Sequence, residues 1–280
     1  MKRLISLFVL FGFVLATVLS SAYAYDKQGF GPAEATEYVT NHFEAKVFKG
    51  EKKATLYYRI HTPDKIDKKK TYPLFLVLHG AGHCGNDNKK QITKSFGPME
   101  IFSCATKIKT EVIIIAPQVP EGGQWVNVPW TGYSHVMPQK PSFSTQMTID
   151  LLKQCVKTMP VNVNRIYITG HSMGGFGTWD ILQRMPNLFA AAIPICGGGD
   201  TKLARKVKYI PIWAFHGDQD KVVKTSRSRN MIYFIKKAGG KPKYTEYKGI
   251  AHNSWGQTYA DQNVLEWFFK QRKSEQKECT

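Results

Sequence analysis

The chain lacks the marks of several protein classes. Apart from residues 1–24, it has no stretch apolar enough to cross a membrane, so we do not expect an integral membrane protein. It has no internal repeats, no low-complexity linker and no nucleic-acid-reading motif, so we expect no nucleic-acid partner. It also lacks a C-x-x-C pair and clustered histidines, and we therefore expect no metal site.

Cysteine is scarce and odd in number. The chain has 5 cysteines, which allow at most two disulfides with one thiol left over: Cys84, Cys104, Cys155, Cys196 and Cys279. Burial as small hydrophobic residues is an equally good interpretation for those in apolar segments. The sequence therefore leaves the pairing open.

Acidic residues are few relative to basic ones. The chain has 39 Lys and Arg against 21 Asp and Glu, a net charge of +18. Such a charge attracts anionic surfaces such as lipid headgroups or acidic polysaccharide, although simple solubility explains it equally well. Only residues 65–70 and 202–208 form basic runs, which are typical of solvated loops or exposed helix faces.

The N-terminus predicts export. Lys2 and Arg3 precede an apolar stretch over residues 4–19, and Ala22-Tyr23-Ala24 fits a small-x-small cleavage site. We expect residues 1–24 to be a signal peptide cleaved after Ala24, which would place the protein in the periplasm or outside the cell. A membrane anchor is the alternative, but the apolar run is short for a span.

The remaining residues, 25–280, read as a single α/β domain with a polar tail over residues 271–280. Two strands are expected over residues 44–48 and 55–60. From residue 74 onward, apolar strand-like runs alternate with helical segments, a pattern that predicts a mainly parallel sheet with helices on both faces. The expected strands cover residues 74–78, 112–116, 165–169, 190–195, 210–215 and 244–247, and the helices 97–107, 143–158, 174–184, 225–238 and 259–272.

The motif that carries most chemistry is Gly170-His171-Ser172-Met173-Gly174. It reads G-x-S-x-G and lies between an apolar strand and a helix, the context of a nucleophile elbow. Glycine allows the tight turn because it has no Cβ. Ser172 is therefore the candidate nucleophile.

A serine nucleophile needs a base and an orienting acid. Asp220 and His252 follow Ser172 in the expected order, each in a loop after a predicted strand. Asp218 is the alternative acid. We interpret His216, at the start of the acid loop, as a buried histidine. No organic cofactor is needed for this chemistry.

The developing oxyanion also needs hydrogen-bond donors. The backbone N–H of Met173 is expected to supply one. The second is expected from the loop Gly80-Ala81-Gly82, where we favour Ala81 over Gly82.

Four stretches together resemble a known family: Leu78 to Gly82, Ile168 to Trp179, His216 to Asp220 and Ala251-His252-Asn253-Ser254-Trp255. They are similar to exported esterases of the dienelactone-hydrolase and feruloyl-esterase-like (phospholipase/carboxylesterase) branch of α/β-hydrolases, over roughly residues 57–269. The resemblance implies an α/β-hydrolase fold and a triad of Ser172, Asp220 and His252. The chain departs from relatives at residues 83–88, where they often carry charged side chains, which affects substrate specificity rather than the triad.

Together these patterns predict an exported serine carboxylesterase acting on a small-molecule or polymer-linked ester. A peptidase or amidase of prolyl-oligopeptidase type could use the same residues. A basic surface-binding protein on a hydrolase scaffold is the non-catalytic alternative. Trp125 and Trp255 are candidate substrate-binding residues, although tryptophans serve equally well as core anchors.

Overall fold

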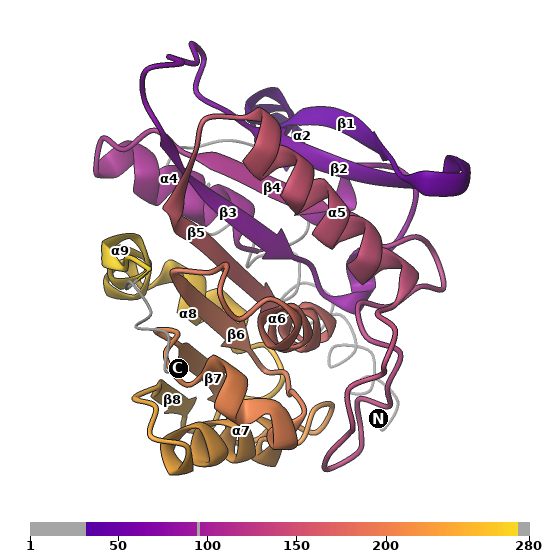
Figure 1. Ribbon diagram of the computed structural model, residues 1–280, viewed down its shortest axis with the longest axis vertical. Coiled ribbons are helices and arrows are strands. Elements are labelled where there is room, and N and C mark those ends of the chain that lie inside the picture. Colours follow the sequence, from indigo (N-terminus) through magenta and orange to yellow (C-terminus); the bar gives the residue numbers. More distant parts are fainter. Residues whose placement is uncertain (1–31, 94–95, 274–280) are drawn as a thin grey trace, which may run out of the picture.

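The computed structural model describes residues 32–93 and 96–273. The expected signal peptide, Cys279 and most of the polar tail lie outside these ranges. The described chain forms an eight-stranded sheet with the order β1-β2-β4-β3-β5-β6-β7-β8 (Figure 1).

The sheet is parallel except at one edge. β1 pairs with β2 and β2 with β4 in antiparallel orientation, and the remaining neighbours are parallel. The expected strands all form, with ends shifted by a few residues. The strands are β1 Glu44–Lys49, β2 Thr55–His61, β3 Tyr72–Leu78, β4 Ile113–Pro117, β5 Val161–His171, β6 Ala191–Ile195, β7 Trp213–Gly217 and β8 Lys243–Tyr247.

Helices cover both faces of the sheet (Figure 1). The α-helices are α2 Pro32–His42, α3 Lys90–Thr93, α4 Pro98–Lys107, α5 Phe143–Thr158, α6 Met173–Arg184, α7 Ser226–Lys237, α8 Trp255–Ala260 and α9 Gln262–Lys270; short 3₁₀ helices are η1 Glu51–Lys53, η2 Ala81–His83 and η3 Thr201–Val207. None of the helices in the described part of the chain has the length and apolarity to span a bilayer.

The helix expected to close the chain over residues 259–272 forms over Gln262–Lys270, so its predicted start is wrong by three residues. Two helices, α8 and α9, occupy this region and meet at Asp261, which has an extended backbone. The Asp261 side chain accepts a hydrogen bond from the N–H of Asn263 and so caps α9.

Two apolar layers lie on opposite faces of the sheet, as the alternation along β3 shows. Leu74, Leu76 and Leu78 pack into one layer with residues of α5, α6 and α7. Phe75 and Val77 pack into the other with residues of α4, α8 and α9. Burial on both faces explains why β3 is a continuous apolar run. The packing of both layers also holds the carboxyl ends of the strands, where the site is built.

Candidate active site

Ser172 lies on the sharp turn between β5 and α6. Its backbone has φ 55° and ψ −120°, a strained conformation for a residue with a side chain. The flanking glycines are required, because a Cβ at Gly174 would lie 2.0 Å from the Leu78 carbonyl oxygen and one at Gly170 2.5 Å from that of Gly174. The turn predicted from the G-x-S-x-G motif is therefore present.

The structure brings together the three residues proposed from the sequence. The Oγ atom of Ser172 lies 2.8 Å from Nε2 of His252, and Nδ1 of His252 lies 2.7 Å from Oδ2 of Asp220. Nδ1 faces a carboxylate and so carries the proton, which leaves Nε2 free to accept the serine hydroxyl. Asp218 points elsewhere, since its Oδ1 accepts the N–H of Gly249 at 2.7 Å.

Asp220 is held as a carboxylate. Its Oδ1 accepts the N–H groups of Val222 and Val223 at 2.8 and 2.9 Å, and its Oδ2 also accepts Nε2–H of His216 at 3.0 Å. Burial alone would raise the pKa of Asp220, but the hydrogen bonds from His216 and His252 outweigh it and hold the pKa below its ordinary range.

His216 supports the acid in a way that the sequence did not reveal. It is buried, as expected, and its Nδ1 bonds the hydroxyl of Ser228 at 2.8 Å. The only sequence feature that pointed to a role for His216 was its position at the start of the loop that carries Asp220. Its partner Ser228 comes from α7, which local patterns could not place.

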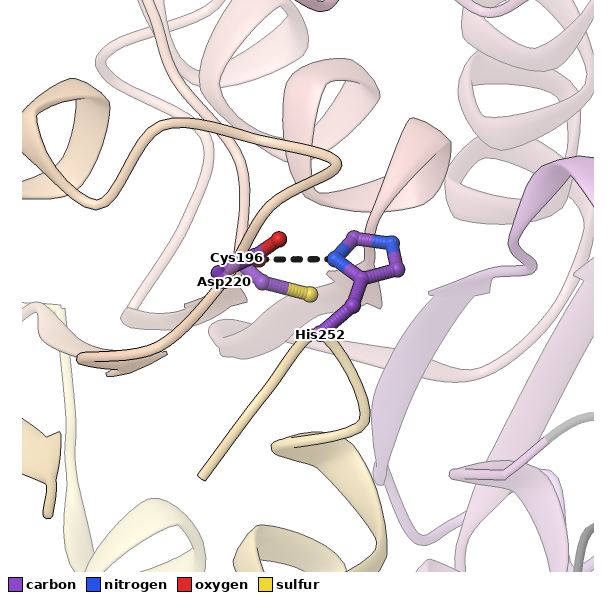
Figure 2. A group of neighbouring side chains, drawn as sticks. All are labelled: Cys196, Asp220 and His252. Carbon is purple, nitrogen blue, oxygen red and sulfur yellow. Dashed lines mark hydrogen bonds and ion pairs between the residues drawn. The ribbon is translucent and has the colours of Figure 1, made fainter. Parts of the chain in front are cut away.

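Cys196 contacts the backbone of the nucleophile. Its Sγ accepts the N–H of Ser172 at 3.3 Å and belongs with Asp220 and His252 to a group whose ligand atoms lie within 4.8 Å (Figure 2). The donor set does not favour a metal ion. Burial beside the Asp220 carboxylate raises the pKa of the Cys196 thiol far above its ordinary value, and Asp220 and His252 bond each other.

The described cysteines form no disulfide. All four of them, Cys84, Cys104, Cys155 and Cys196, are free thiols. Three are buried, which agrees with their interpretation as small hydrophobic residues.

The two expected oxyanion donors open helical turns at the same edge of the sheet. Ala81 begins η2 and Met173 begins α6, where backbone N–H groups have no intrahelical acceptor. The loops interlock closely: a Cβ on Gly80 would lie 2.8 Å from Nε2 of His171, whereas one on Gly82 would meet nothing within 4 Å.

The two candidate substrate-binding tryptophans have different environments. Trp125 is 0 % exposed, and its indole N–H donates to the His79 carbonyl at 2.9 Å. The structure therefore corrects its expected role: it is a core residue, since no substrate reaches a fully buried ring. Trp255 is partly exposed, stacks on His171 and lies edge-on to His252 with ring centroids 5.2 Å apart.

A buried cation anchors the long loop over residues 118–142. Arg227 on α7 is 2 % exposed, and it donates to the Gly132 carbonyl at 3.3 Å and to Nδ1 of His135. Its guanidinium lies 5.0 Å from the ring centroid of Phe176, one turn after Ser172. None of the ion pairs in the described part of the chain involves Arg227. No sequence motif marked this residue.

Comparisons with known proteins bear on the family and the fold of the chain. A family model described as Phospholipase/Carboxylesterase matches residues 65–264. A crystal structure of a thermostable esterase is similar with a TM-score of 0.78 and 36 % identity, covering 84 % of this chain and 64 % of that one. A ferulic acid esterase shares the fold at 17 % identity, with a TM-score of 0.58 over 81 % of this chain and 97 % of that one.

One curated relative matches over a short region. It is a bifunctional acetylxylan esterase/xylanase, XynS20E, from Neocallimastix patriciarum, 29 % identical over 79 residues. The match covers 28 % of this chain and 12 % of that protein. The chain thus spans less than two thirds of both the curated relative and the thermostable esterase.

Proposed function

Because the chain belongs to the phospholipase/carboxylesterase family and has the predicted α/β-hydrolase fold, we propose that it is a serine hydrolase that cleaves carboxylic esters. The observation that carries the proposal is the hydrogen-bonded series from Ser172 through His252 to a buried, ionised Asp220. Such a series activates a hydroxyl that is otherwise a weak nucleophile near neutral pH.

In the first half-reaction, Ser172 Oγ attacks the ester carbonyl carbon while Nε2 of His252 takes the hydroxyl proton. Asp220 holds the imidazole in the productive tautomer and stabilises its positive charge. The carbonyl oxygen becomes an oxyanion, which the N–H groups of Met173 and Ala81 stabilise. The tetrahedral intermediate then breaks its bond to the alcohol oxygen, which leaves with the proton from His252.

In the second half-reaction, water attacks the acyl-serine ester. His252 accepts a proton from this water, the same donors stabilise the second oxyanion, and the acid product leaves as Ser172 regains its proton. No step needs a redox group or an organic cofactor. The same chemistry serves amides, so parallel kinetics on a matched ester and amide separate the esterase from the peptidase alternative.

We propose that the natural substrate is an acyl ester carried by a polymer. One relative, the acetylxylan esterase/xylanase, is named for an acyl ester of a polysaccharide, and the ferulic acid esterase is named for a hydroxycinnamoyl ester. The half-exposed Trp255 beside His252 is an apolar surface that could receive the acyl or alcohol group. A panel of acetyl, butyryl and hydroxycinnamoyl esters, each compared as a small ester and attached to a polysaccharide, tests this assignment.

We also propose that the protein is exported through residues 1–24, which end in Ala22-Tyr23-Ala24. N-terminal sequencing of the protein recovered from its native host tests this point. A mature N-terminus at Tyr25 supports export by a cleaved signal peptide, and an intact leader contradicts it.

The mechanism is tested by labelling with a fluorophosphonate, read by intact mass and peptide mapping. A stoichiometric adduct on Ser172 that is absent from the His252→Ala variant is the expected result. Ester turnover by Ser172→Ala comparable to the parent would overturn the proposal, because loss of a triad residue costs several orders of magnitude in kcat. Absence of an adduct on folded protein would favour the non-catalytic, surface-binding alternative.

A further inference from the structure

A basic groove lies at the amino ends of β7 and β8, whereas the candidate active site lies at the carboxyl ends of the strands. It has a volume of about 420 Å³, and its lining includes Lys208, Tyr209, Lys241, Lys243, Trp267 and Gln271. Three of these residues are lysines, and none is acidic. We refer to this set as the basic groove.

The topology separates the basic groove from Ser172. Its lysines precede β7 or lie just before and at the start of β8, so they lie at the amino ends of these strands, and Trp267 and Gln271 are added from α9 and its C-cap. Ser172, Asp220 and His252 follow strands at their carboxyl ends. A strand of 5 residues is roughly 16 Å long at about 3.3 Å per residue, so the groove is not part of the reaction site.

The lysines of the groove form no ion pair with any acidic residue within residues 32–93 and 96–273. None of the ion pairs in the described part of the chain involves Lys208, Lys241 or Lys243. Three ammonium groups around one hollow repel one another, and an anionic ligand relieves that repulsion.

Aromatic rings orient two of these ammonium groups. Nζ of Lys243 lies 4.3 Å from the ring centroid of Trp213 and 5.5 Å from that of Trp267. Nζ of Lys208 lies 4.6 Å from the ring centroid of Tyr209, a side chain that is 57 % exposed. The cation–π contacts restrain both lysines before any ligand arrives, which lowers the entropy cost of binding.

We propose that the basic groove binds carboxylate groups of an acidic polysaccharide chain. A concave, open site admits a single polymer chain, whereas a bilayer presents a plane of headgroups. Single-stranded nucleic acid stacks its bases on free aromatic faces, and an ammonium group covers one face of Tyr209 and of Trp267. The inference rests on the proposed function in one respect only, namely that the bound polymer is one that carries esters. Binding itself needs no catalysis.

A binding site remote from the nucleophile holds an enzyme on its polymer between turnovers. Its effect is therefore on insoluble or polymeric substrates and not on small esters. By raising the local concentration of enzyme, it lowers the apparent KM for a polymer-linked ester and leaves kcat unchanged.

The test measures binding of the full chain carrying Ser172→Ala, so that hydrolysis does not alter the ligand. Affinity electrophoresis in polygalacturonate at low and high salt compares two further variants. One combines Lys208→Gln, Lys241→Gln and Lys243→Gln in the groove. The control combines Lys49→Gln, Lys153→Gln and Lys157→Gln, which removes the same charge from exposed lysines on β1 and α5.

The expected result is salt-sensitive binding that falls about tenfold in the groove variant and stays near the parent value in the control. Equal binding by the groove variant and the parent, or an equal loss in the control, would overturn the proposal. So would groove-dependent binding to phosphatidylglycerol vesicles or to single-stranded oligonucleotide without binding to polygalacturonate.

Turnover of p-nitrophenyl acetate by the same lysine variants with Ser172 intact keeps the two proposals apart. We expect both to match the parent. If the groove variant loses polymer binding but keeps normal turnover, the groove binds the polymer independently of catalysis. If the parent and every variant lack turnover, the proposed esterase activity is contradicted and the groove proposal is unaffected.

Discussion

The Sγ atom of Cys196 accepts a hydrogen bond from the backbone N–H of Ser172 at 3.3 Å. The same N–H donates to the Ile195 carbonyl at 3.0 Å, so the turn retains an acceptor without the thiol. Cys196 itself has a φ of 38° and is fully buried. Its contact with the elbow is therefore one of packing, not of proton transfer.

Cys196→Ala should consequently lower stability more than catalysis. Removing the buried sulfur leaves a small cavity, and we expect the free energy of unfolding to fall by about 1–2 kcal/mol. The kcat for a small ester should remain within a few-fold of the parent. Urea unfolding and steady-state kinetics check both values. A fall in kcat of two orders of magnitude in a folded variant would show instead that the thiol takes part in catalysis.

Gly80→Ala should impair catalysis through the oxyanion loop. The new Cβ would lie 2.8 Å from Nε2 of His171, whose ring is buried against Trp255 and cannot give way cheaply. The loop that carries Ala81 must then shift, and loss of one oxyanion donor costs about 3 kcal/mol, or roughly 100-fold in kcat. Gly82→Ala is the matched control, because its Cβ meets nothing within 4 Å. Similar kcat values for the two variants would argue against this loop as a donor.

The hydrogen bond from His216 to Asp220 predicts a pH-dependent stability effect. The pKa of Asp220 lies below its unfolded value of about 4. Its contribution is therefore present above about pH 4 and is lost as pH falls through the folded pKa. His216→Phe removes one donor and raises that pKa, so the stability lost by the variant should be full at pH 7 and smaller at pH 2, where the folded carboxyl begins to bind a proton.

Urea unfolding at the two pH values measures this difference. Ser228→Ala is the control, because it removes the partner of His216 Nδ1 without touching Asp220. Its cost should be similar at both pH values. A pH-independent loss in His216→Phe would mean that His216 acts by packing alone.

The sequence was sufficient for the fold and for the residues that meet at the candidate site, because both depend on local order along the chain. The turn around Ser172 needs glycines beside it, and Asp220 and His252 each follow a strand.

The sequence did not distinguish Trp125 from Trp255. The burial of Trp125 depends on how the loop over residues 118–142 packs on α6, and that of Trp255 on how the start of α8 packs against His171 and His252. His216 was expected to be buried, but its hydrogen bond to Asp220 was not foreseen, because it depends on how the loop folds back within a few residues. Arg227 was not singled out, because its partners Gly132 and His135 come from a distant segment.

The different burial of the two tryptophans predicts different effects of substitution. Trp125→Leu should lower the free energy of unfolding by about 3–4 kcal/mol, because a fully buried ring and its hydrogen bond to His79 are lost. Trp255→Leu should change the ratio of kcat/KM between acetyl and hydroxycinnamoyl esters with a smaller loss of stability. A loss of stability at Trp255 with unchanged selectivity would make it a core anchor.

The contact between Arg227 and His135 predicts that acid releases the loop over residues 118–142. Burial, with a further contribution from the Arg227 charge, lowers the pKa of His135 to about 4. Released from the contact, His135 would regain a pKa of about 6.5. Because the open loop binds a proton more readily than the closed one, the closed form becomes less stable as pH falls from about 6.5 to about 4 and changes little outside this window.

Hydrogen exchange over residues 126–136, corrected for the intrinsic pH dependence of exchange, measures this opening. Exchange in the parent should become faster as pH falls from about 6.5 to about 4. The His135→Gln variant retains an acceptor but does not titrate, so its corrected exchange rate should not change over this range. Arg227→Met should exchange faster at every pH, because the hydrogen bond to Gly132 is lost along with the charge. A rise of the same size in His135→Gln would place the titrating group elsewhere. Since Arg227 also lies over Phe176 on the helix that begins after Ser172, release of the loop should accompany a higher KM in the same pH window.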